Sequence, residues 1–231
     1  MALLGEAAMI LAFDIAPNAI SEHDHWHSHE HLHERMSIPG FLRGSRWSSK
    51  DSSPRYFVMY EVSDLETLSA SPYLDRLNNP SVWTAKMMKY YHGMNRGFCR
   101  LVFSGGYGLG SYCLLLRFSP DPEHEVALRD WLARKALASL HKKTGLVSAH
   151  QFEAALTPEM TKEQRIRGKD SGVDWVLLVT GYDKDAVGEL AAAELSVTEL
   201  ERHGCINLVS CIYQMEHSLS RTEIEIPDST D

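Results

Sequence analysis

The sequence predicts an α+β protein: a tandem duplication of a ferredoxin-like β-α-β-β-α-β unit, with the two antiparallel sheets packing into an α+β barrel. Two observations support this prediction. Strand-like and helix-like segments follow each other in the same order in both halves of the 231-residue chain, which indicates an internal repeat. Each unit by itself would leave one apolar sheet face uncovered, and two such faces in one chain can cover each other.

The first half contains four runs rich in β-branched and aromatic residues, separated by turn signals. Two segments with helical spacing lie between them, and prolines at Pro72 and Pro80 predict that the second is a broken helix. We interpret the apolar residues before Met9 as a dispensable leader. The predicted strands are 9–14, 41–47, 55–62 and 97–103, and the predicted helices are 21–38 and 64–91.

The second half repeats this order after a glycine-rich stretch, 104–111, that predicts a flexible connector. The first unit therefore spans residues 1–108, and a degenerate second unit with an acidic C-terminal tail spans 109–231. The charged segment 158–172 has no apolar period, which predicts a mobile loop over one end of the barrel. The predicted strands are 111–118, 147–153, 173–183 and 206–214, and the predicted helices are 122–143 and 186–203.

Composition argues against a nucleic-acid or anionic-membrane surface, because the net charge is −8 and basic residues form no cluster. No apolar run approaches the roughly 20 residues that a membrane-spanning helix needs. The four cysteines stand singly in apolar runs without paired spacing, which predicts buried free thiols in a cytoplasmic protein. We expect a small-molecule substrate as the partner, and a homodimer is a further possibility.

Six of the twelve histidines alternate with other residues from His23 to His33. Ser21 resembles a helix N-cap and Pro39-Gly40 a stop, so the histidines should lie on one helix. At 100° per residue, the helix presents two histidine faces. One face combines Trp26, Leu32 and Met36 with His25, His29 and His33, and the other carries His27, Glu30, His31 and Glu34.

Part of the first half resembles a known superfamily. Trp26, Glu30-His31-Leu32, Glu34-Arg35 and Pro39-Gly40-Phe41, together with the runs 56–61 and 73–88, are similar to the dimeric α+β barrel superfamily, in particular its EthD-like and tandem members. The resemblance implies the barrel fold but no single reaction, because the superfamily includes monooxygenases, lactone isomerases, polyketide cyclases and haem proteins. His33 replaces the usual proline, and the second half has Lys135-Ala136-Leu137 instead of Glu30-His31-Leu32, so we expect the site in the first half.

His31 is the leading catalytic candidate, because a histidine beside Glu30 and Glu34 should have a near-neutral pKa and transfer protons in both directions. A solvated ion-pair stripe with Arg35 is the structural alternative. Strand residues facing the barrel interior should line a pocket, where an arginine holds an anion and a tyrosine donates to an oxyanion. The predicted catalytic residues are His31, Glu30, Tyr60 and Arg43, and the predicted substrate-binding residues are Arg46, Trp47, Glu61 and His92.

The run His27 to His31 also matches the H-x-x-E-H pattern of inverted zinc peptidases. Such spacings arise automatically when every second residue is histidine, and the sequence offers no distant third ligand. As an alternative, a divalent metal such as zinc, iron or manganese binds His27, His31 and Glu34. A set of exposed, core-packed or acid–base histidines is the other interpretation.

The sequence thus favours a small-molecule enzyme without an organic cofactor. Its predicted reaction is proton transfer, of isomerase, lyase or cyclase type, on a small aromatic or unsaturated acid in the barrel pocket. A metal-dependent enzyme and a non-catalytic ligand- or metal-binding protein are the alternatives. We expect His31→Ala to abolish activity with little loss of stability, since the ring should be partly exposed, whereas Trp26→Ala should destabilise the fold.

Overall fold

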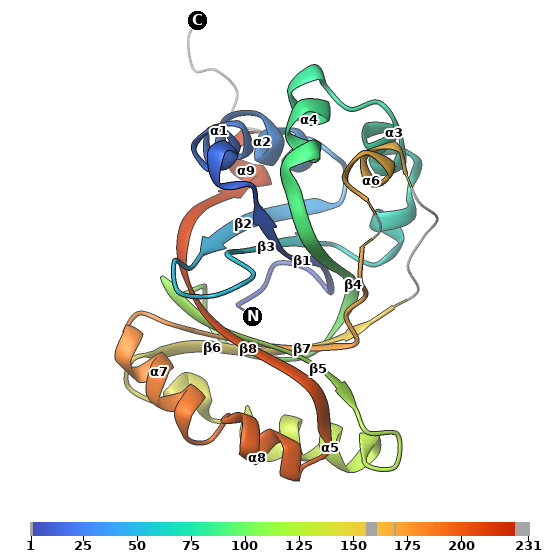
Figure 1. The fold of residues 1–231 in the computed structure, drawn as a ribbon. Coiled ribbons are helices and arrows are strands. Elements are labelled where there is room, and N and C mark those ends of the chain that lie inside the picture. The colour runs from blue at the N-terminus through green and yellow to red at the C-terminus, as the bar shows by residue number, and fades with distance from the viewer. Residues whose placement is uncertain (1, 156–160, 169, 225–231) are drawn as a thin grey trace, which may run out of the picture.

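The computed structural model describes residues 2–155, 161–168 and 170–224, and its centre is a closed eight-stranded antiparallel barrel (Figure 1). Around the barrel the strands follow the order β1-β3-β2-β8-β5-β7-β6-β4. Their bounds are β1 Ala7–Ile15, β2 Phe41–Ser48, β3 Tyr56–Val62, β4 Tyr91–Gly106, β5 Tyr112–Pro120, β6 Leu146–Ala154, β7 Trp175–Gly181 and β8 Cys205–Ser220.

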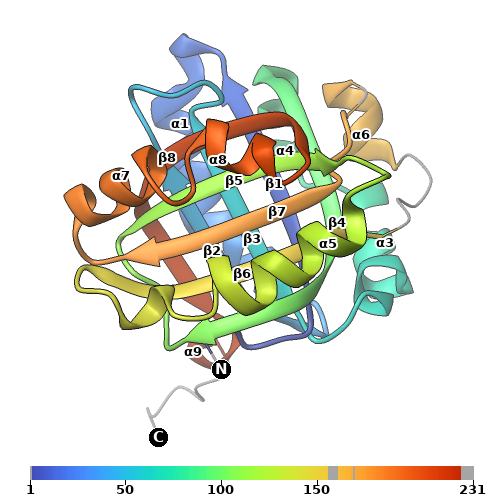
Figure 2. The same cartoon turned by 90° about the horizontal axis from the view of Figure 1, so that it is seen from below.

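Helices cover the barrel on two opposite sides (Figure 1). The first half contributes α1 (Ile20–Trp26), the π-helical turn η2 (His27–His31), α2 (Leu32–Met36), α3 (Ser71–Asn78) and α4 (Val82–Met87), with short 3-10 turns η1 (Pro17–Ala19), η3 (Glu66–Ser69) and η4 (Met88–Tyr90). The second half contributes α5 (Glu125–Trp131), a π-helical turn η5 (Leu132–Ala136), η6 (Leu140–Lys142), α6 (Lys162–Arg167), α7 (Lys184–Ala192), α8 (Val197–Arg202) and α9 (Arg221–Ile224). Figure 2 shows α5, α7 and α8 of the second half lying across β5 to β8, whereas α6 and α9 lie beside the first-half helices α3 and α2.

The two halves are joined through their strand edges. We expected two sheets pressed face to face, whereas β2 pairs with β8 and β4 pairs with β6, so backbone hydrogen bonds close the barrel. Both β4 and β8 are 16 residues long, and this length lets each of them pair with strands of both halves. Closure leaves no free sheet edge in the barrel, which removes a route to aggregation.

Three apolar layers result. One fills the barrel, and the other two lie between each half of the barrel and its helices. The ligand cavity that we expected in the barrel interior is instead occupied by packed side chains, of which Trp47 and Phe57 stack with ring centroids 4.8 Å apart. Leu3 belongs to this interior layer and is 4% exposed, so the residues before Met9 are not a dispensable leader.

Several predicted elements need correction. The fourth strand begins at Tyr91 rather than Gly97, because the helical segment before it ends at Tyr90. The segment predicted as a mobile loop, 158–172, contains α6, while residues 158–160 and 169 lie outside the described residues. The thiols are free and buried as predicted. None of the described helices is long and apolar enough to cross a membrane.

Both halves place a tryptophan immediately before a π-helical turn, Trp26 before η2 and Trp131 before η5. This agreement supports a repeated unit, and the tandem duplication itself stays a prediction. The predicted boundary at residues 108 and 109 falls in the connection between β4 and β5. The C-terminal tail begins later than its polar sequence suggests, because β8 extends to Ser220 and α9 follows it directly.

Candidate functional site

A small buried cavity lies between the first-half helices and the outer face of β1, β3 and β4. Its volume is about 20 Å³, which is room for roughly one water molecule. Wider grooves of about 580 and 970 Å³ lie on the surface. The small cavity differs from them because several buried titratable side chains of the first half line it. Its lining comprises Met9, Leu11, Phe13, His27, His31, Arg35, Val58, Tyr60, Tyr73, Leu77, Met88, Tyr91, Arg96, Glu163 and Arg167.

The π-helical turn η2 decides which residues after His31 lie on the cavity side of the helix. The Leu32 N–H bonds to the His27 carbonyl, five residues back, so one turn contains an extra residue. Side chains after the turn are consequently rotated by about 100° relative to a continuous α-helix, and Leu32, Arg35 and Met36 are buried on the same side as the histidines. His23, His27 and His31 stand four residues apart and form one buried column. The predicted separation of His27 and His31 from His25, His29 and His33 is correct, but the predicted burial is wrong, because Trp26, Leu32 and Met36 are buried and His25, His29 and His33 are exposed.

The helix also begins earlier than predicted. Its first turn is the 3-10 turn at Pro17, and proline suits this position because its missing N–H would have no partner in a first turn. Ser21 lies inside α1, and the N-cap of α1 is Ala19, which makes no side-chain cap hydrogen bond. The predicted end is correct: α2 ends at Met36, and Gly40 has a φ of 88°, a conformation that favours glycine.

Two of the predicted catalytic residues meet in the cavity. Tyr60 reaches across from β3, and its hydroxyl lies 3.3 Å from Nε2 of His27. His31 packs on Trp26, with ring centroids 4.4 Å apart, and makes no hydrogen bond to a described residue. The Nδ1 atoms of both histidines are buried and lack a partner among the described residues. His31 thus has ring nitrogens that are free to exchange a proton with a ligand.

A hydrogen-bonded chain runs from the cavity toward the surface. The hydroxyl of Tyr91, which lines the cavity, lies 3.2 Å from Nε2 of His23, and Nδ1 of His23 lies 3.0 Å from Oδ1 of Asp24. Asp24 also accepts a 2.8 Å hydrogen bond from Tyr56 and is 32% exposed. The sequence prediction missed His23, although it lies four residues before His27 and eight before His31 and so belongs to the same helix face.

Burial controls the protonation of the column. Desolvation holds the pKa of His27 and of His31 well below the usual 6.5, and the positive charge of Arg35 lowers the pKa of His31 further. The pKa of His23 is also lowered by burial, against the opposing effect of Asp24. The predicted near-neutral pKa of His31 is therefore wrong, because its neighbours in space are Arg35 and apolar residues rather than carboxylates.

The two glutamates beside His31 in sequence have structural contacts instead. Glu30 accepts hydrogen bonds from Trp26 (3.1 Å) and from Ser81 (2.5 Å), so it ties the histidine helix to α4. Glu34 lies 3.5 Å from Arg76 of α3, and burial raises its pKa. Neither residue lines the cavity.

The remaining predicted site residues lie elsewhere. Arg43, Trp47 and Glu61 point into the barrel, where Nε of Arg43 donates a 2.6 Å hydrogen bond to Glu61. Arg46 donates to Glu216 and to the Asp24 carbonyl beneath α1. His92 is exposed. Adjacent strand residues alternate between faces, so Tyr60 faces the helices whereas Glu61 faces the barrel interior.

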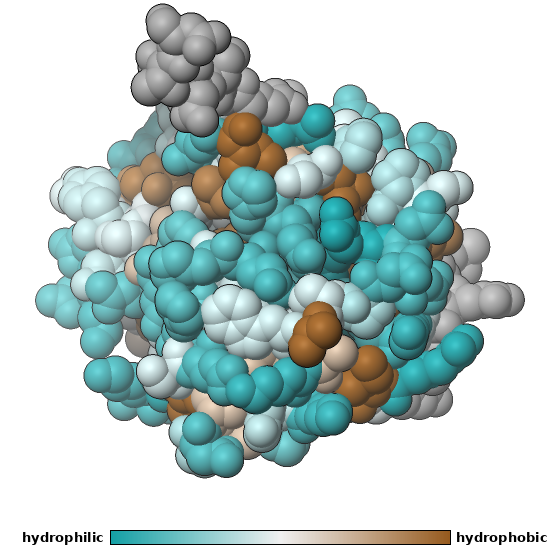
Figure 3. Space-filling model, turned by 90° about the horizontal axis from the view of Figure 1, so that it is seen from above, coloured by the Kyte–Doolittle hydropathy of each residue, from teal (hydrophilic) through white to brown (hydrophobic). Residues whose placement is uncertain are grey.

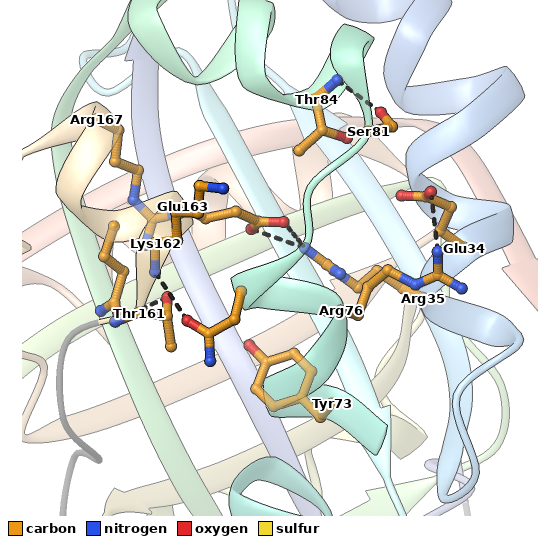
Figure 4. A network of polar contacts seen from close by, with 12 residues as sticks. Glu34, Arg35, Tyr73, Arg76, Ser81, Thr84, Thr161, Lys162, Glu163 and Arg167 are labelled. Atoms are coloured by element: carbon orange, nitrogen blue, oxygen red, sulfur yellow. Dashed lines mark hydrogen bonds and ion pairs between the residues drawn. The ribbon is translucent and has the colours of Figure 1, made fainter. Parts of the chain in front are cut away.

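A buried ion pair between the two halves closes the cavity (Figure 4). Nη2 of Arg35, on α2, donates 2.9 Å hydrogen bonds to both carboxylate oxygens of Glu163, on α6, and the two side chains are 2% and 3% exposed. Nearby, Asp170 pairs with Arg167 at 2.7 Å and lies 3.1 Å from Arg96. Glu163 and Arg35 are 128 residues apart, and the sequence prediction placed neither in the site.

The metal alternative has only part of its ligand set in place. The rings of His27 and His31 lie side by side with centroids 5.4 Å apart, but Glu34 is directed to Arg76. Among the described residues no group of three or more His, Cys, Asp or Glu side chains is arranged to hold a metal ion.

Seen from the side of the first-half helices, the surface of the molecule is largely hydrophilic with separate apolar patches (Figure 3).

Comparison with solved structures supports the architecture. An anthrone oxidase-like protein is 12% identical, with 96% of each chain covered and a TM-score of 0.65. A candidate monooxygenase from Lactobacillus acidophilus NCFM is 10% identical over 93% of this chain and 96% of that chain, with a TM-score of 0.59. Chlorite dismutase from Candidatus Nitrospira defluvii is 12% identical over 94% and 92%, with a TM-score of 0.56.

No protein-family model and no curated protein sequence matches the chain. At these identities the structural likeness shows the fold alone, and similarity to the EthD-like members stays a prediction. The chain therefore has the α+β barrel fold that these oxidase-like, monooxygenase and dismutase proteins share.

Proposed function

We propose that the protein is an enzyme that removes a proton from a small aromatic or unsaturated molecule bound beside the histidine column. One observation carries this proposal: the neutral ring of His31, without a hydrogen bond to a described residue, borders a cavity that is also lined by three guanidinium groups and three phenols. A base without a competing hydrogen bond is available to the substrate, and the surrounding donors can stabilise the anion that forms.

In this mechanism a C–H or O–H bond of the substrate breaks, and the proton is transferred to an imidazole nitrogen of His31. The electron pair stays on the substrate as an enolate or phenolate. The guanidinium of Arg35, the next cation along the helix face, stabilises that negative charge, and Tyr60 donates a hydrogen bond. As the anion forms, it offsets the burial that disfavours a charged His31.

Proton exchange with solvent then uses the chain Tyr91, His23 and Asp24. The Tyr91 hydroxyl borders the cavity, and Asp24 reaches the surface. Protons can therefore move along the two hydrogen bonds that join Tyr91, His23 and Asp24. His23 positions Tyr91 in this scheme, while Asp24 fixes the tautomer of His23 by accepting from Nδ1.

A second candidate function is oxygenation. The names of two structural neighbours, an anthrone oxidase-like protein and a candidate monooxygenase, favour it. Both candidates begin with the same deprotonation, and they differ in the fate of the anion: internal reprotonation or rearrangement gives an isomerase, lyase or cyclase, whereas reaction with O₂ gives a monooxygenase.

A panel of phenolic acids, lactones and anthrone tests both candidates. Compounds that bind are identified by thermal shift, since a ligand at 100 times its dissociation constant stabilises by about 2.7 kcal/mol. Each binder is then incubated with enzyme in an oxygen electrode and analysed for products. Oxygen uptake in step with substrate loss identifies the monooxygenase, and substrate conversion without oxygen uptake identifies the isomerase, lyase or cyclase.

Metal removal provides a separate prediction. If His31 acts as the base, dialysis against EDTA leaves both the rate and the melting temperature unchanged, because no step needs a metal. If a metal instead binds His27 and His31, the imidazoles must be neutral, so occupancy falls as the pH drops and the chelator lowers rate and melting temperature together. A stoichiometric metal that is lost with activity in His27→Ala would favour the metal alternative.

A further inference from the structure

The Arg35–Glu163 pair has the chemistry of a carboxylate-recognition site. A guanidinium can hold a carboxylate with two parallel N–H donors, whereas here one nitrogen, Nη2 of Arg35, contacts both oxygens of Glu163, and both partners are almost fully buried. Nη1 of Arg35 is also buried and has no hydrogen-bond partner among the described residues. Arg35, which lines the cavity, therefore has donor capacity that Glu163 does not use.

Among the described residues, the charged groups around the cavity leave an excess of one cation. Three lining guanidinium groups, on Arg35, Arg96 and Arg167, face two carboxylates, on Glu163 and Asp170, and burial keeps the cavity histidines neutral. An uncompensated cation in a poorly solvated site favours binding of one anion.

The cavity itself is too small for an aromatic ring, so a substrate must displace side chains that line it. Most lining residues belong to barrel strands or to helices packed over the sheet, whereas Glu163 and Arg167 come from α6 of the second half. Other contacts of α6 with the first half include a 3.2 Å hydrogen bond from the Lys162 N–H to Asn78 and apolar packing by Ile166. Figure 4 shows Glu163 extending from α6 to Arg35.

We infer that the carboxylate of Glu163 occupies the position of a substrate carboxylate, and that Arg35 selects aromatic acids by exchanging one for the other. The exchange conserves a buried, bidentate ion pair. A neutral ligand that displaced Glu163 would leave Arg35 buried without a counter-charge, so neutral analogues bind more weakly. This inference rests on the proposed function, because it places the acid beside His31.

Isothermal titration with 2-naphthoate and its neutral analogue 2-naphthamide tests the exchange. Wild type should bind the carboxylate at least 10-fold more tightly than the amide, and Glu163→Gln should bind 2-naphthoate at least 10-fold more tightly than wild type because the competing carboxylate is gone. Affinity for 2-naphthamide should rise as well, because the amide no longer has to break the Arg35–Glu163 ion pair, and 2-naphthoate should remain the tighter ligand. Glu153→Gln is the matched control, since Glu153 is likewise held by two hydrogen bonds from one arginine, Arg129, on the second-half side of the barrel.

The double variant Arg35→Gln/Glu163→Gln removes both charges and decides the question even if Glu163→Gln fails to fold. It should lose the preference for 2-naphthoate over 2-naphthamide. A preference that persists in the double variant, an unchanged affinity for 2-naphthoate in Glu163→Gln, or no 2-naphthoate binding at all overturns the inference. Failure of the proposed reaction is distinguishable, because these measurements record binding without turnover.

Discussion

Lowering the pH from 8 to 5 should remove up to about 4 kcal/mol of folding free energy through two histidines, His27 and His31. Both have a pKa well below 6.5 in the folded state because burial disfavours the imidazolium. The unfolded chain therefore binds more protons below pH 6.5. The contribution of these two histidines to the free energy of unfolding is fully present above pH 6.5. It decreases as the pH falls toward the folded-state pKa, by up to about 1.4 kcal/mol per pH unit for each histidine.

Denaturant unfolding at half-unit steps from pH 8 to 5 measures this loss. His31→Gln should flatten the dependence by about one proton, whereas His33→Gln, at an exposed position on the same helix, should leave the slope unchanged. The lowered pKa of the buried His23 and His150 acts in the same direction, and the raised pKa of Glu34 and Glu61 acts in the opposite direction, so the difference between wild type and His31→Gln is what isolates the contribution of His31. A slope that is the same in wild type and His31→Gln would mean that His31 is not buried in its neutral form.

Trp26→Ala should cost about 3–5 kcal/mol, the value typical of a fully buried aromatic residue. The Trp26 ring is 0% exposed, stacks near His31 and donates a hydrogen bond to Glu30, so its removal opens a cavity behind the histidine column. Because domains of this kind are stable by roughly 5–15 kcal/mol, the variant should be close to unfolding at physiological temperature.

Trp131→Ala is the matched control, since Trp131 holds the same position before the second π-helical turn. Its ring is only partly buried and stacks on His203 with centroids 3.7 Å apart, so the substitution should cost clearly less. Denaturant unfolding of the two variants compares the costs directly. Equal losses would show that the two tryptophans are equally important to the fold, contrary to the difference in their burial.

The structure predicts a larger loss of stability for His31→Ala than the sequence did. Sequence periodicity suggested a partly exposed ring, but His31 is 6% exposed and packs on Trp26. Some loss of stability is therefore expected along with the loss of activity, and His31→Gln, which retains more of the side-chain volume, is the better test.

The order of strands and helices along the chain and the barrel architecture were predictable because alternation and turn residues determine where strands begin and end, whereas closure through the β2–β8 and β4–β6 pairs was not. The face of the sheet to which each strand residue points was not predictable. Tyr60 and Glu61 are adjacent, and only the packed fold shows that Tyr60 faces the helices. The pocket was predicted in the barrel, yet apolar residues from both halves fill that space.

The candidate site was predictable only in its first-half components. His27, His31 and Tyr60 were identified from residue type and position, whereas a single-residue π insertion places Leu32, Arg35 and Met36 on the side of His27 and His31, which a fixed period of 3.6 does not predict. Glu163 was missed because its partner Arg35 is 128 residues away, and no local pattern links them. In physical terms, local rules predicted the elements, and long-range packing determined the site.

The central claim is that the first-half cavity, with His31 as base, is where the reaction occurs. The most direct measurement is the rate of deuterium uptake from D₂O into the panel compound that gives the largest thermal shift, with wild type, His31→Gln and Arg43→Gln compared at pH 7.5. His31→Gln should lower the rate of deuterium uptake by about 10²- to 10⁴-fold. Folded Arg43→Gln, whose substitution lies in the barrel interior, should retain most of the wild-type rate. Unchanged exchange in a folded His31→Gln protein, or loss confined to Arg43→Gln, would contradict the central claim.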